Sequence, residues 1–159
     1  MRTGILDISP FTFGGKMTYD DCEWHSDTTI ELGLGTEAGA THIGIFYAWA
    51  VAHDLHEPTR LFWGEPEPRP RPELAELRNR TKTPGRYLLD HCCGQIDHGD
   101  LNVRGRAFAD AAYRQYLRAY DRIPEIARNE TTYHAPDTWE TYDAVATLLD
   151  EAWAEWHRS

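Results

Sequence analysis

The most apolar stretch of the chain lies between Thr36 and His53, and its large side chains are not confined to one helical face. They are Ile43, Ile45, Phe46, Tyr47, Trp49 and Val51. A helix that is apolar all round is usually buried on most sides. The segment is shorter than the ~20 residues that a membrane span needs. The pattern therefore predicts a helix that begins near Thr36, as its N-cap, ends near His53 and lies at the centre of the core.

Two longer segments repeat apolar residues at helical spacing. Residues 103–121 carry one wide apolar stripe made of Phe108, Ala109, Ala112, Tyr113, Tyr116 and Tyr120. In the last segment Asp137 is a candidate N-cap with Glu140 three residues later, and apolar residues recur on one face from Trp139 to Trp156. We also expect short helices over residues 72–80, with Pro72 in the first turn, and over residues 85–92.

The remaining segments lack helical periodicity. Residues 1–16 contain β-favouring residues and close with Gly14-Gly15, which predicts a short extended segment. Residues 17–35, 94–102 and 122–136 are polar or turn-rich and are expected to form loops, the first with at most one helical turn. From Glu65 to Pro72, prolines alternate with Glu and Arg, a pattern typical of an extended surface connection.

These patterns predict a mainly α protein, a single compact domain of about five helices around a buried central helix, with a short extended N-terminal segment. We expect residues 1–16 to be an N-terminal extension and residues 17–159 to form one helical domain with a Pro-rich surface loop at 64–72. A length of 159 residues suits one domain. A hydrophobic content of 41% argues against disorder.

The charge balance narrows the choice of partners. The chain has 16 Lys and Arg against 26 Asp and Glu, a formal net charge of −10. Such a surface is repelled by nucleic acids and by anionic membranes, whereas it would attract a basic protein. The N-terminus lacks the pattern of a signal peptide. The three cysteines, two of them adjacent, do not suggest a disulfide framework, so we expect a cytoplasmic protein.

Two histidines of the predicted central helix are candidates for chemistry. His42 and His53 are eleven residues apart and share a face with Phe46 and Trp49. They are about 16 Å apart along a helix, so they cannot ligate one metal together. His42 is the better functional candidate, and His53 suits a helix C-terminus. The alternative is that each histidine is a hydrogen-bonded group in or beside the core.

The segment before this helix carries an acidic cluster with one imidazole. Its binding candidates are Tyr19, Asp20, Asp21, Glu23, Trp24 and His25, and those of the helix are His42 and Trp49. Asp20, Asp21, His25 and His42 would suit a divalent metal ion, or acid–base chemistry, if the 17–35 segment folded over the helix. The alternative is that Asp20 or Asp21 caps a helical turn while Trp24 packs inward.

The remaining motifs do not specify a reaction. His91, Cys92, Cys93, Asp97 and His98 include metal-capable side chains, but the paired spacing of a zinc site is missing, which favours buried structural thiols. The sequence contains no phosphate-binding glycine loop, no dinucleotide-binding fingerprint and no nucleophile elbow. We therefore expect no enzyme activity of these classes and no cofactor, with a divalent metal ion as the alternative.

Several fragments taken together resemble a known family. They are Met17-x-Tyr19-Asp20-Asp21-x-x-Trp24-His25, Ala40-Thr41-His42-Ile43-Gly44-x-Phe46-x-Ala48-Trp49, Lys82-Thr83-Pro84, Cys92-x-Gly94, Asp100-Leu101-Asn102-x-x-Gly105-x-x-Phe108-Ala109 and Asp137-Thr138-Trp139-Glu140-x-Tyr142-Asp143. Their order resembles small uncharacterised bacterial proteins of the DUF7832 type, over about residues 17–157. The resemblance implies no established activity. The chain departs from this pattern in two places. It has additional residues before Met17, and it has Cys93 at a position where the family tends to have Asp.

Two functional hypotheses follow. The first is a non-catalytic binding protein, immunity-like by its size and acidity, which sequesters a basic partner through the exposed members of Asp20, Asp21, Glu23 and Trp24. The second is a metal-dependent enzyme or metal-binding module that uses Asp20, Asp21, His25 and His42. A third interpretation treats the same cluster as a metal-free small-molecule pocket. Whether these side chains converge in space separates the hypotheses.

Overall fold

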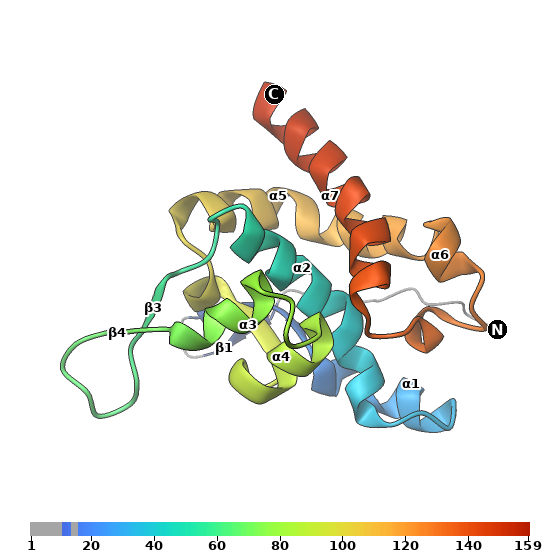
Figure 1. The fold of residues 1–159 in the computed structure, drawn as a ribbon, viewed down its shortest axis with the longest axis horizontal. Helices are drawn as coiled ribbons and strands as arrows, with labels where there is room; N and C mark the ends of the chain where they lie inside the picture. Colours follow the sequence, from blue (N-terminus) through green and yellow to red (C-terminus); the bar gives the residue numbers. More distant parts are fainter. Residues whose placement is uncertain (1–10, 14–15) are drawn as a thin grey trace.

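The computed structural model describes residues 11–13 and 16–159, so most of the predicted extension over residues 1–16 lies outside the described residues. The described part is mainly α-helical, as predicted (Figure 1). Its α-helices are α1 (Ser26–Glu31), α2 (Thr41–Ala52), α3 (Ala75–Arg78), α4 (Pro84–His91), α5 (Val103–Tyr120), α6 (Pro124–Ala127) and α7 (Trp139–Arg158). Short 3-10 helices are η1 (Cys22–His25), η2 (Thr36–Ala40), η3 (Pro72–Leu74), η4 (His98–Asp100) and η5 (Thr132–His134).

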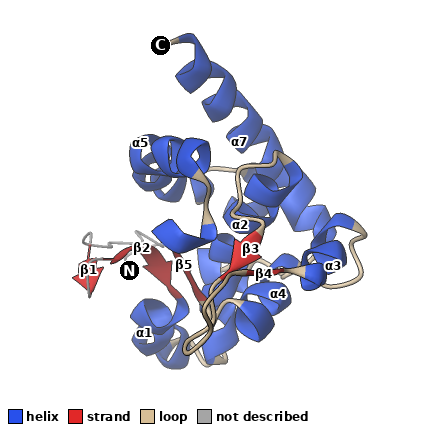
Figure 2. Ribbon diagram, turned by 90° about the vertical axis from the view of Figure 1, so that its left-hand side faces the viewer, coloured by secondary structure: helices blue, strands red, loops and turns tan. Residues whose placement is uncertain are grey.

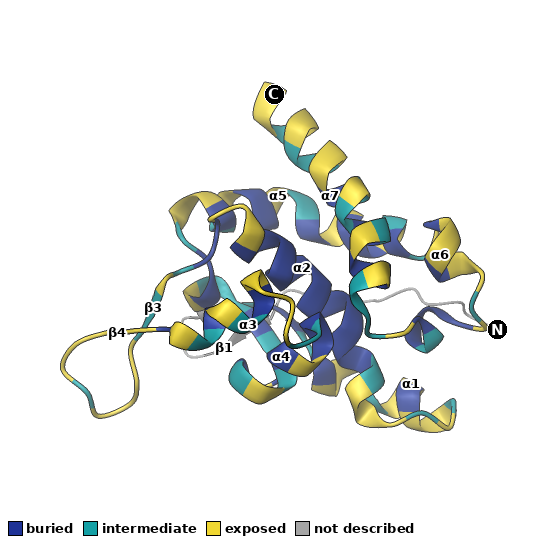
Figure 3. Ribbon diagram, in the orientation of Figure 1, coloured by how far each residue is buried: buried dark blue, intermediate teal, exposed yellow. Residues whose placement is uncertain are grey.

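Helix α2 is the centre of the core, which confirms the prediction from its apolar pattern. Every residue from Thr41 to Val51 is buried, and Figure 3 shows the helix as one continuous buried segment. Helices α4 and α3 contact it on one side, and α7 contacts it on another. The start of the helix differs from the prediction, because Thr36 begins η2 and α2 itself begins at Thr41.

A glycine allows α4 to approach α2 closely. A Cβ atom at Gly44 would lie 2.3 Å from the carbonyl oxygen of Pro84, the first residue of α4. Real Cβ contacts are never that short, so any larger residue would push the two helices apart. This contact seats the N-terminus of α4 against the middle of the central helix.

Two small sheets complete the fold (Figure 2). In the first, β2 (Lys16–Asp21) lies between β1 (Phe11–Phe13) and β5 (Gln95–Asp97), and both pairings are antiparallel. In the second, β3 (Thr59–Arg60) pairs with β4 (Arg69–Pro70). The Pro-rich surface loop predicted at 64–72 covers the end of the β3–β4 connection, β4, Arg71 and the first residue of η3. It is exposed over most of residues 64–70, but Arg71 is buried.

Three predicted loops contain regular structure. Residues 17–35 hold most of β2, all of η1 and α1, residues 94–102 hold β5 and η4, and residues 122–136 hold α6 and η5. The strand β2 lacks an apolar alternation because its most buried residue is Asp20. The other missed elements are six residues long or shorter, too short to show a period.

The prediction that Asp137 caps the last helix is wrong. Thr138 is the N-cap of α7, and its hydroxyl accepts the backbone N–H of Thr141. The carboxylate of Asp137 instead caps α4 from outside: it accepts the backbone N–H groups of Gly85 at 2.8 Å and Arg86 at 3.0 Å. It also accepts the hydroxyl of Thr83 at 2.6 Å. Because Thr138 has its own hydroxyl, the neighbouring carboxylate is available to another helix.

We expect Asp137→Ala to lower the free energy of unfolding by about 1–2 kcal/mol, because two N–H groups at the start of α4 lose their acceptor. Chemical denaturation followed by circular dichroism measures the change. Glu140→Ala is the control, since Glu140 is exposed in the first turn of α7 and its removal should change stability by less than about 0.5 kcal/mol. Equal losses for the two variants would contradict the assignment of Asp137 to α4.

Candidate functional site

Three side chains from three different elements meet in the interior of the protein. Asp20 lies near the end of β2, His25 ends η1, and His42 lies in the first turn of α2. Nε2 of His25 is 2.7 Å from Asp20 Oδ1, and Nε2 of His42 is 2.9 Å from Asp20 Oδ2. The exposed fractions of the three residues are 0%, 4% and 3%. One ligand atom from each lies within 4.8 Å of the others. We call these three residues the Asp-His-His cluster.

The local backbone aims these side chains at one point. The pairing of β2 with β5 shifts between Thr18 and Asp20, so Tyr19 is an extra residue in the strand. Such a bulge re-aims the side chains beside it, and Tyr19 and Asp20 are both buried although they are neighbours. The Asp21 carboxylate then accepts the backbone N–H of Glu23 at 2.9 Å and starts η1. This turn brings His25 back to Asp20.

The hydroxyl groups of three tyrosines form hydrogen bonds with the residues of the cluster. The Tyr113 hydroxyl of α5 donates to Asp20 Oδ2 at 2.8 Å, and the Tyr133 hydroxyl of η5 is 2.7 Å from Nδ1 of His25. The Tyr116 hydroxyl donates to the backbone carbonyl of His42 at 2.6 Å. The backbone N–H of Asp21 donates to Asp20 Oδ1 at 2.9 Å. The Asp20 carboxylate therefore has four hydrogen-bonding partners.

Burial and hydrogen bonding set the charges in the cluster. Burial disfavours the charged form of Asp20, but the hydrogen bonds from His25 and His42 outweigh it, so the pKa of Asp20 lies below its usual range. Burial lowers the pKa of His42, against the opposing effect of Asp20. Burial and Asp20 together hold the pKa of Tyr113 well above 10. At neutral pH these directions give an ionised Asp20, a neutral His42 and a protonated Tyr113.

The other candidate residues lie outside the cluster. Asp21 is half-buried and caps η1, while Glu23 and Trp24 are exposed, so Trp24 does not pack inward. The Tyr19 hydroxyl donates to Asp110 at 2.6 Å rather than to Asp20. The structure thus brings together three of the four residues of the metal hypothesis and leaves Asp21 in a capping role.

The far end of α2 has a separate hydrogen-bond network. The indole N–H of Trp49 donates to Asp150 at 2.9 Å, and Nε2 of His53 is 3.3 Å from the same carboxylate. The rings of Trp49 and His53 stack with centroids 4.2 Å apart. As the spacing predicted, His42 and His53 belong to different sites. Trp49 and His53 link α2 to α7 and do not contribute to the cluster.

Sequence reasoning missed Tyr113 and Tyr133 as members of the site. The sequence pattern places Tyr113 only in the apolar stripe of its helix, and Tyr133 lies in a segment predicted to be a loop. A tyrosine in a core position carries a hydroxyl that needs a partner when it is buried. That requirement is the one signal in the sequence that pointed from these residues to a buried acceptor.

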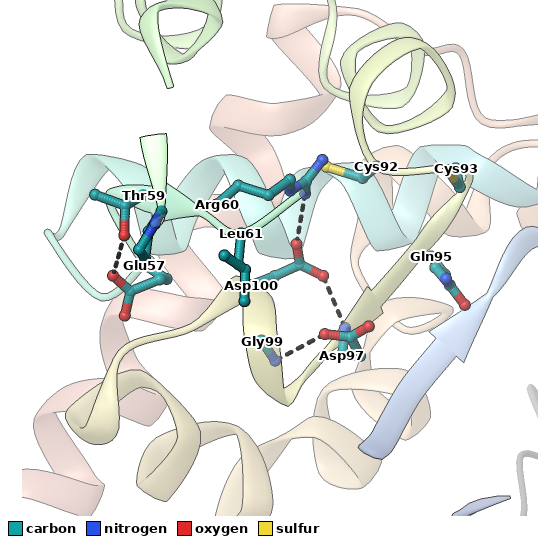
Figure 4. A pocket seen from close by; sticks show the side chains of 11 residues that line it. Glu57, Thr59, Arg60, Leu61, Cys92, Cys93, Gln95, Asp97, Gly99 and Asp100 are labelled. Carbon is teal, nitrogen blue, oxygen red and sulfur yellow. Dashed lines mark hydrogen bonds and ion pairs between the residues drawn. The ribbon is translucent and has the colours of Figure 1, made fainter. Parts of the chain in front are cut away.

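A polar recess lies beside β5, where the sequence places the adjacent cysteines (Figure 4). It has a volume of about 520 Å³. The Arg60 guanidinium donates to Asp100 at 2.9 Å and to the carbonyl of His91. Cys92 is buried and Cys93 is exposed, so the expectation of two buried thiols holds only for Cys92. Burial raises the pKa of the Cys92 thiol to about 12.

The backbone at Cys93 has a conformation that favours Asp or Asn over Cys. Its φ is +55°, in the left-handed region where Asp and Asn occur several-fold more often than other residues with a Cβ atom. An acidic residue at this position of the family would suit the backbone without any metal or catalytic role. The side chain of Cys93 is exposed and lines the recess rather than the Asp-His-His cluster.

Comparison with known families gives one match, and it covers the cluster. A family model described as a domain of unknown function (DUF7832) matches residues 18–135. The chain belongs to the DUF7832 family. The DUF7832 match contains Asp20, His25, His42, Tyr113 and Tyr133, and it ends before α7 and the fragment that begins at Asp137. Searches of curated proteins and of solved structures returned no match.

The burial of the thiols yields a prediction about their reactivity. At pH 8 we expect a disulfide reagent to label one thiol per native chain quickly, because only Cys93 is exposed while burial raises the pKa of Cys22 to about 11 and that of Cys92 to about 12. Labelling in denaturant should reach all three cysteines. Cys93→Ser should abolish the fast phase. Rapid labelling of more than one thiol in the native protein would contradict the placement of Cys22 and Cys92.

Proposed function

We propose that the protein is a metal-binding protein that holds a divalent transition-metal ion, zinc-like in its ligand preference, through Asp20, His25 and His42. The observation that carries this proposal is the convergence of one carboxylate oxygen and one ring nitrogen from each of two imidazoles within 4.8 Å. Imidazole and carboxylate ligands suit Zn²⁺ and related ions. This is the hypothesis that the sequence left as the alternative.

The charge of the site supports a cation. Asp20 is fully buried, and among the described residues its ion-pair partners are only His25 and His42, with no Lys or Arg. A buried carboxylate without a permanent counter-charge is costly. Lowered pKa values of Asp20 and His42 favour the ionised carboxylate and the neutral imidazole, which are the forms that bind metals.

The hydrogen-bonded cluster would have to rearrange to admit an ion. Zinc bonds of about 2.0–2.1 Å in a tetrahedron place neighbouring ligand atoms about 3.3 Å apart. The two nitrogen–oxygen distances, 2.7 Å to Oδ1 and 2.9 Å to Oδ2, would each open by about half an ångström, and the carboxylate would either bind the ion through both oxygens or turn to offer one of them. Tyr133 on Nδ1 of His25 orients that ring, and Tyr113 orients the carboxylate, as outer groups do in metal sites.

A structural role for the metal is favoured over catalysis. A cavity of about 60 Å³ borders the cluster at Tyr19 and Tyr113, and a larger one borders it at Asp21 and Cys22. Neither cavity is lined by Asp20, His25 or His42. A metal in this position would tie β2, η1 and α2 together without direct access for a substrate from these two cavities. We therefore propose a non-catalytic metal site.

The immunity-like role remains a proposal that rests on the acidity and size of the chain. Its contact residues must be revised, because the buried Asp20 cannot take part in a protein interface and Asp21 is half-buried. Glu23 and Trp24 remain exposed. In the described part of the chain, no helix combines the length and the apolar content of a membrane span.

We expect metal-free protein to take up one Zn²⁺ per chain. At a free Zn²⁺ concentration of about 100 times Kd, binding should stabilise the fold by about 2.7 kcal/mol. For a chain of this length that raises Tm by about 5–10 °C. Elemental analysis of the purified protein and thermal denaturation with Zn²⁺ or a chelator measure the two effects. Cobalt substitution should give a visible absorption band from the same site.

Matched variants separate the site from general metal binding. His42→Asn and Asp20→Asn should abolish stoichiometric binding, and circular dichroism reports whether each variant is folded. His53→Asn is the control, because it lies on the same helix but pairs with Asp150 and should bind metal normally. Wild-type protein with no stoichiometric metal, and with a Tm that neither Zn²⁺ nor a chelator changes, would show that the cluster is a hydrogen-bond network alone.

A further inference from the structure

The ribbon of β3 and β4 and the loop that joins them project from the body of the protein, on the left of Figure 1. We call residues 59–70 the arm. Three consecutive large apolar residues, Leu61, Phe62 and Trp63, follow β3, and their exposed fractions are 61%, 45% and 102%. The arm is predominantly exposed in Figure 3, in contrast to the buried helix α2 at the centre of the molecule.

A surface cluster of this kind is unusual in a chain that buries its other large apolar groups well. The remaining exposed large apolar residues of the described part are Trp24, Ile30 and Val103, which lie in three different elements. Single exposed apolar residues are normal and need no explanation. A contiguous apolar patch, in contrast, marks an interaction site, and Trp is the residue most enriched in binding hot spots.

Contacts within the arm hold this cluster in place. Arg69 forms a salt bridge with Glu65 and lies over the ring of Phe62, 5.2 Å from its centroid. The backbone N–H of Glu65 donates to the carbonyl of Phe62 at 3.0 Å and closes a turn. Prolines at 66, 68 and 70 further restrict the backbone. An arm that is already ordered loses little conformational freedom on binding, which favours affinity.

The polar recess of Figure 4 adjoins the base of the arm, and Leu61 of the arm is one of the residues that line it. Three carboxylates and one cation line it: Glu57, Asp97 and Asp100 against Arg60. Arg60 is paired with Asp100, and among the described residues Glu57 and Asp97 form no salt bridge with Lys or Arg. The recess therefore has an excess of negative charge, beside the apolar cluster of a chain whose net charge is −10.

We infer that the arm is the docking surface for a basic protein partner, whose apolar side chains cover Leu61, Phe62 and Trp63 while a Lys or Arg enters the recess near Glu57 and Asp97. Charge complementarity selects a cationic segment and disfavours an anionic membrane. The recess volume of about 520 Å³ accommodates a long basic side chain. The inference is independent of the metal site, which involves neither the arm nor the recess.

The test uses displayed peptides as the probe. Random peptides are selected on the full-length protein, and the enriched sequences are synthesised with a fluorophore for anisotropy measurements. We expect enriched peptides to combine aromatic or aliphatic residues with Lys or Arg. Trp63→Ser should weaken their binding by about tenfold or more. Ile30→Ser is the control, because Ile30 is as exposed as Leu61 but lies on α1, and it should leave the affinity unchanged.

A second pair of variants tests the charge. Glu57→Gln with Asp97→Asn removes two carboxylates but keeps side chains that can accept the hydrogen bonds from Thr59 and the Gly99 N–H. This double variant should weaken binding and flatten its dependence on salt. Asp27→Asn, at an exposed position of α1, should change neither. Chelator-treated protein should bind the peptides equally well. The peptide-binding result can therefore be interpreted even if the protein binds no metal.

Four outcomes would overturn the inference. The first is that no peptide is enriched, and the second is that the enriched peptides lack basic residues or bind Trp63→Ser normally. A third is self-association in sedimentation that Trp63→Ser abolishes, because the occupant of the arm would then be a second copy of the chain. The last is Trp63-dependent binding to uncharged phosphatidylcholine vesicles, which would identify a membrane as the occupant.

Discussion

An ionised carboxylate that is removed from water must keep its hydrogen-bond donors, and in this protein that requirement falls on Asp20. Its donors come from segments far apart in sequence. The imidazole of His25 lies in η1, that of His42 lies in the first turn of α2, and Tyr113 lies in α5. Removing any one of them would leave part of a buried charge unsatisfied, which costs more than a lost surface hydrogen bond. The arrangement of β2, η1, α2 and α5 around this carboxylate is therefore strongly coupled.

This coupling explains why irregular structure is concentrated beside the site. The bulge at Tyr19 and the Asp21 cap of η1 both occur within two residues of Asp20. The bulge interrupts the regular strand pairing, the cap starts η1, and both orient the side chains beside them. A Cβ atom at Gly39 would lie 3.1 Å from the Cβ of His25, so η2 packs tightly against the base of the His25 side chain. The regular helices form a rigid framework, and these local irregularities orient the side chains around Asp20.

Sequence patterns predicted the frame far better than the site. Apolar residues on all sides of α2, and the stripe on α5, report burial directly, because burial of large side chains is what makes a helix stable in a core. The strand β2 gave no such signal, since its most buried residue is charged. Convergence of Asp20, His25 and His42 depends on turns and on a strand pairing with residues 95–97, which no local period encodes. The residue types suggested a metal, but only three of the four suggested ligands meet.

The family match and the core do not end at the same residue. The match stops at residue 135, yet Trp153 of α7 lies edge-on to Phe108 at 5.1 Å and to Trp49 at 6.0 Å. The indole N–H of Trp49 also donates to Asp150 in the same helix. Without α7, these side chains of α2 and α5 would lose their cover on that side. The physical unit that buries α2 therefore extends through α7, whereas the Asp-His-His cluster and the arm both lie within the matched residues.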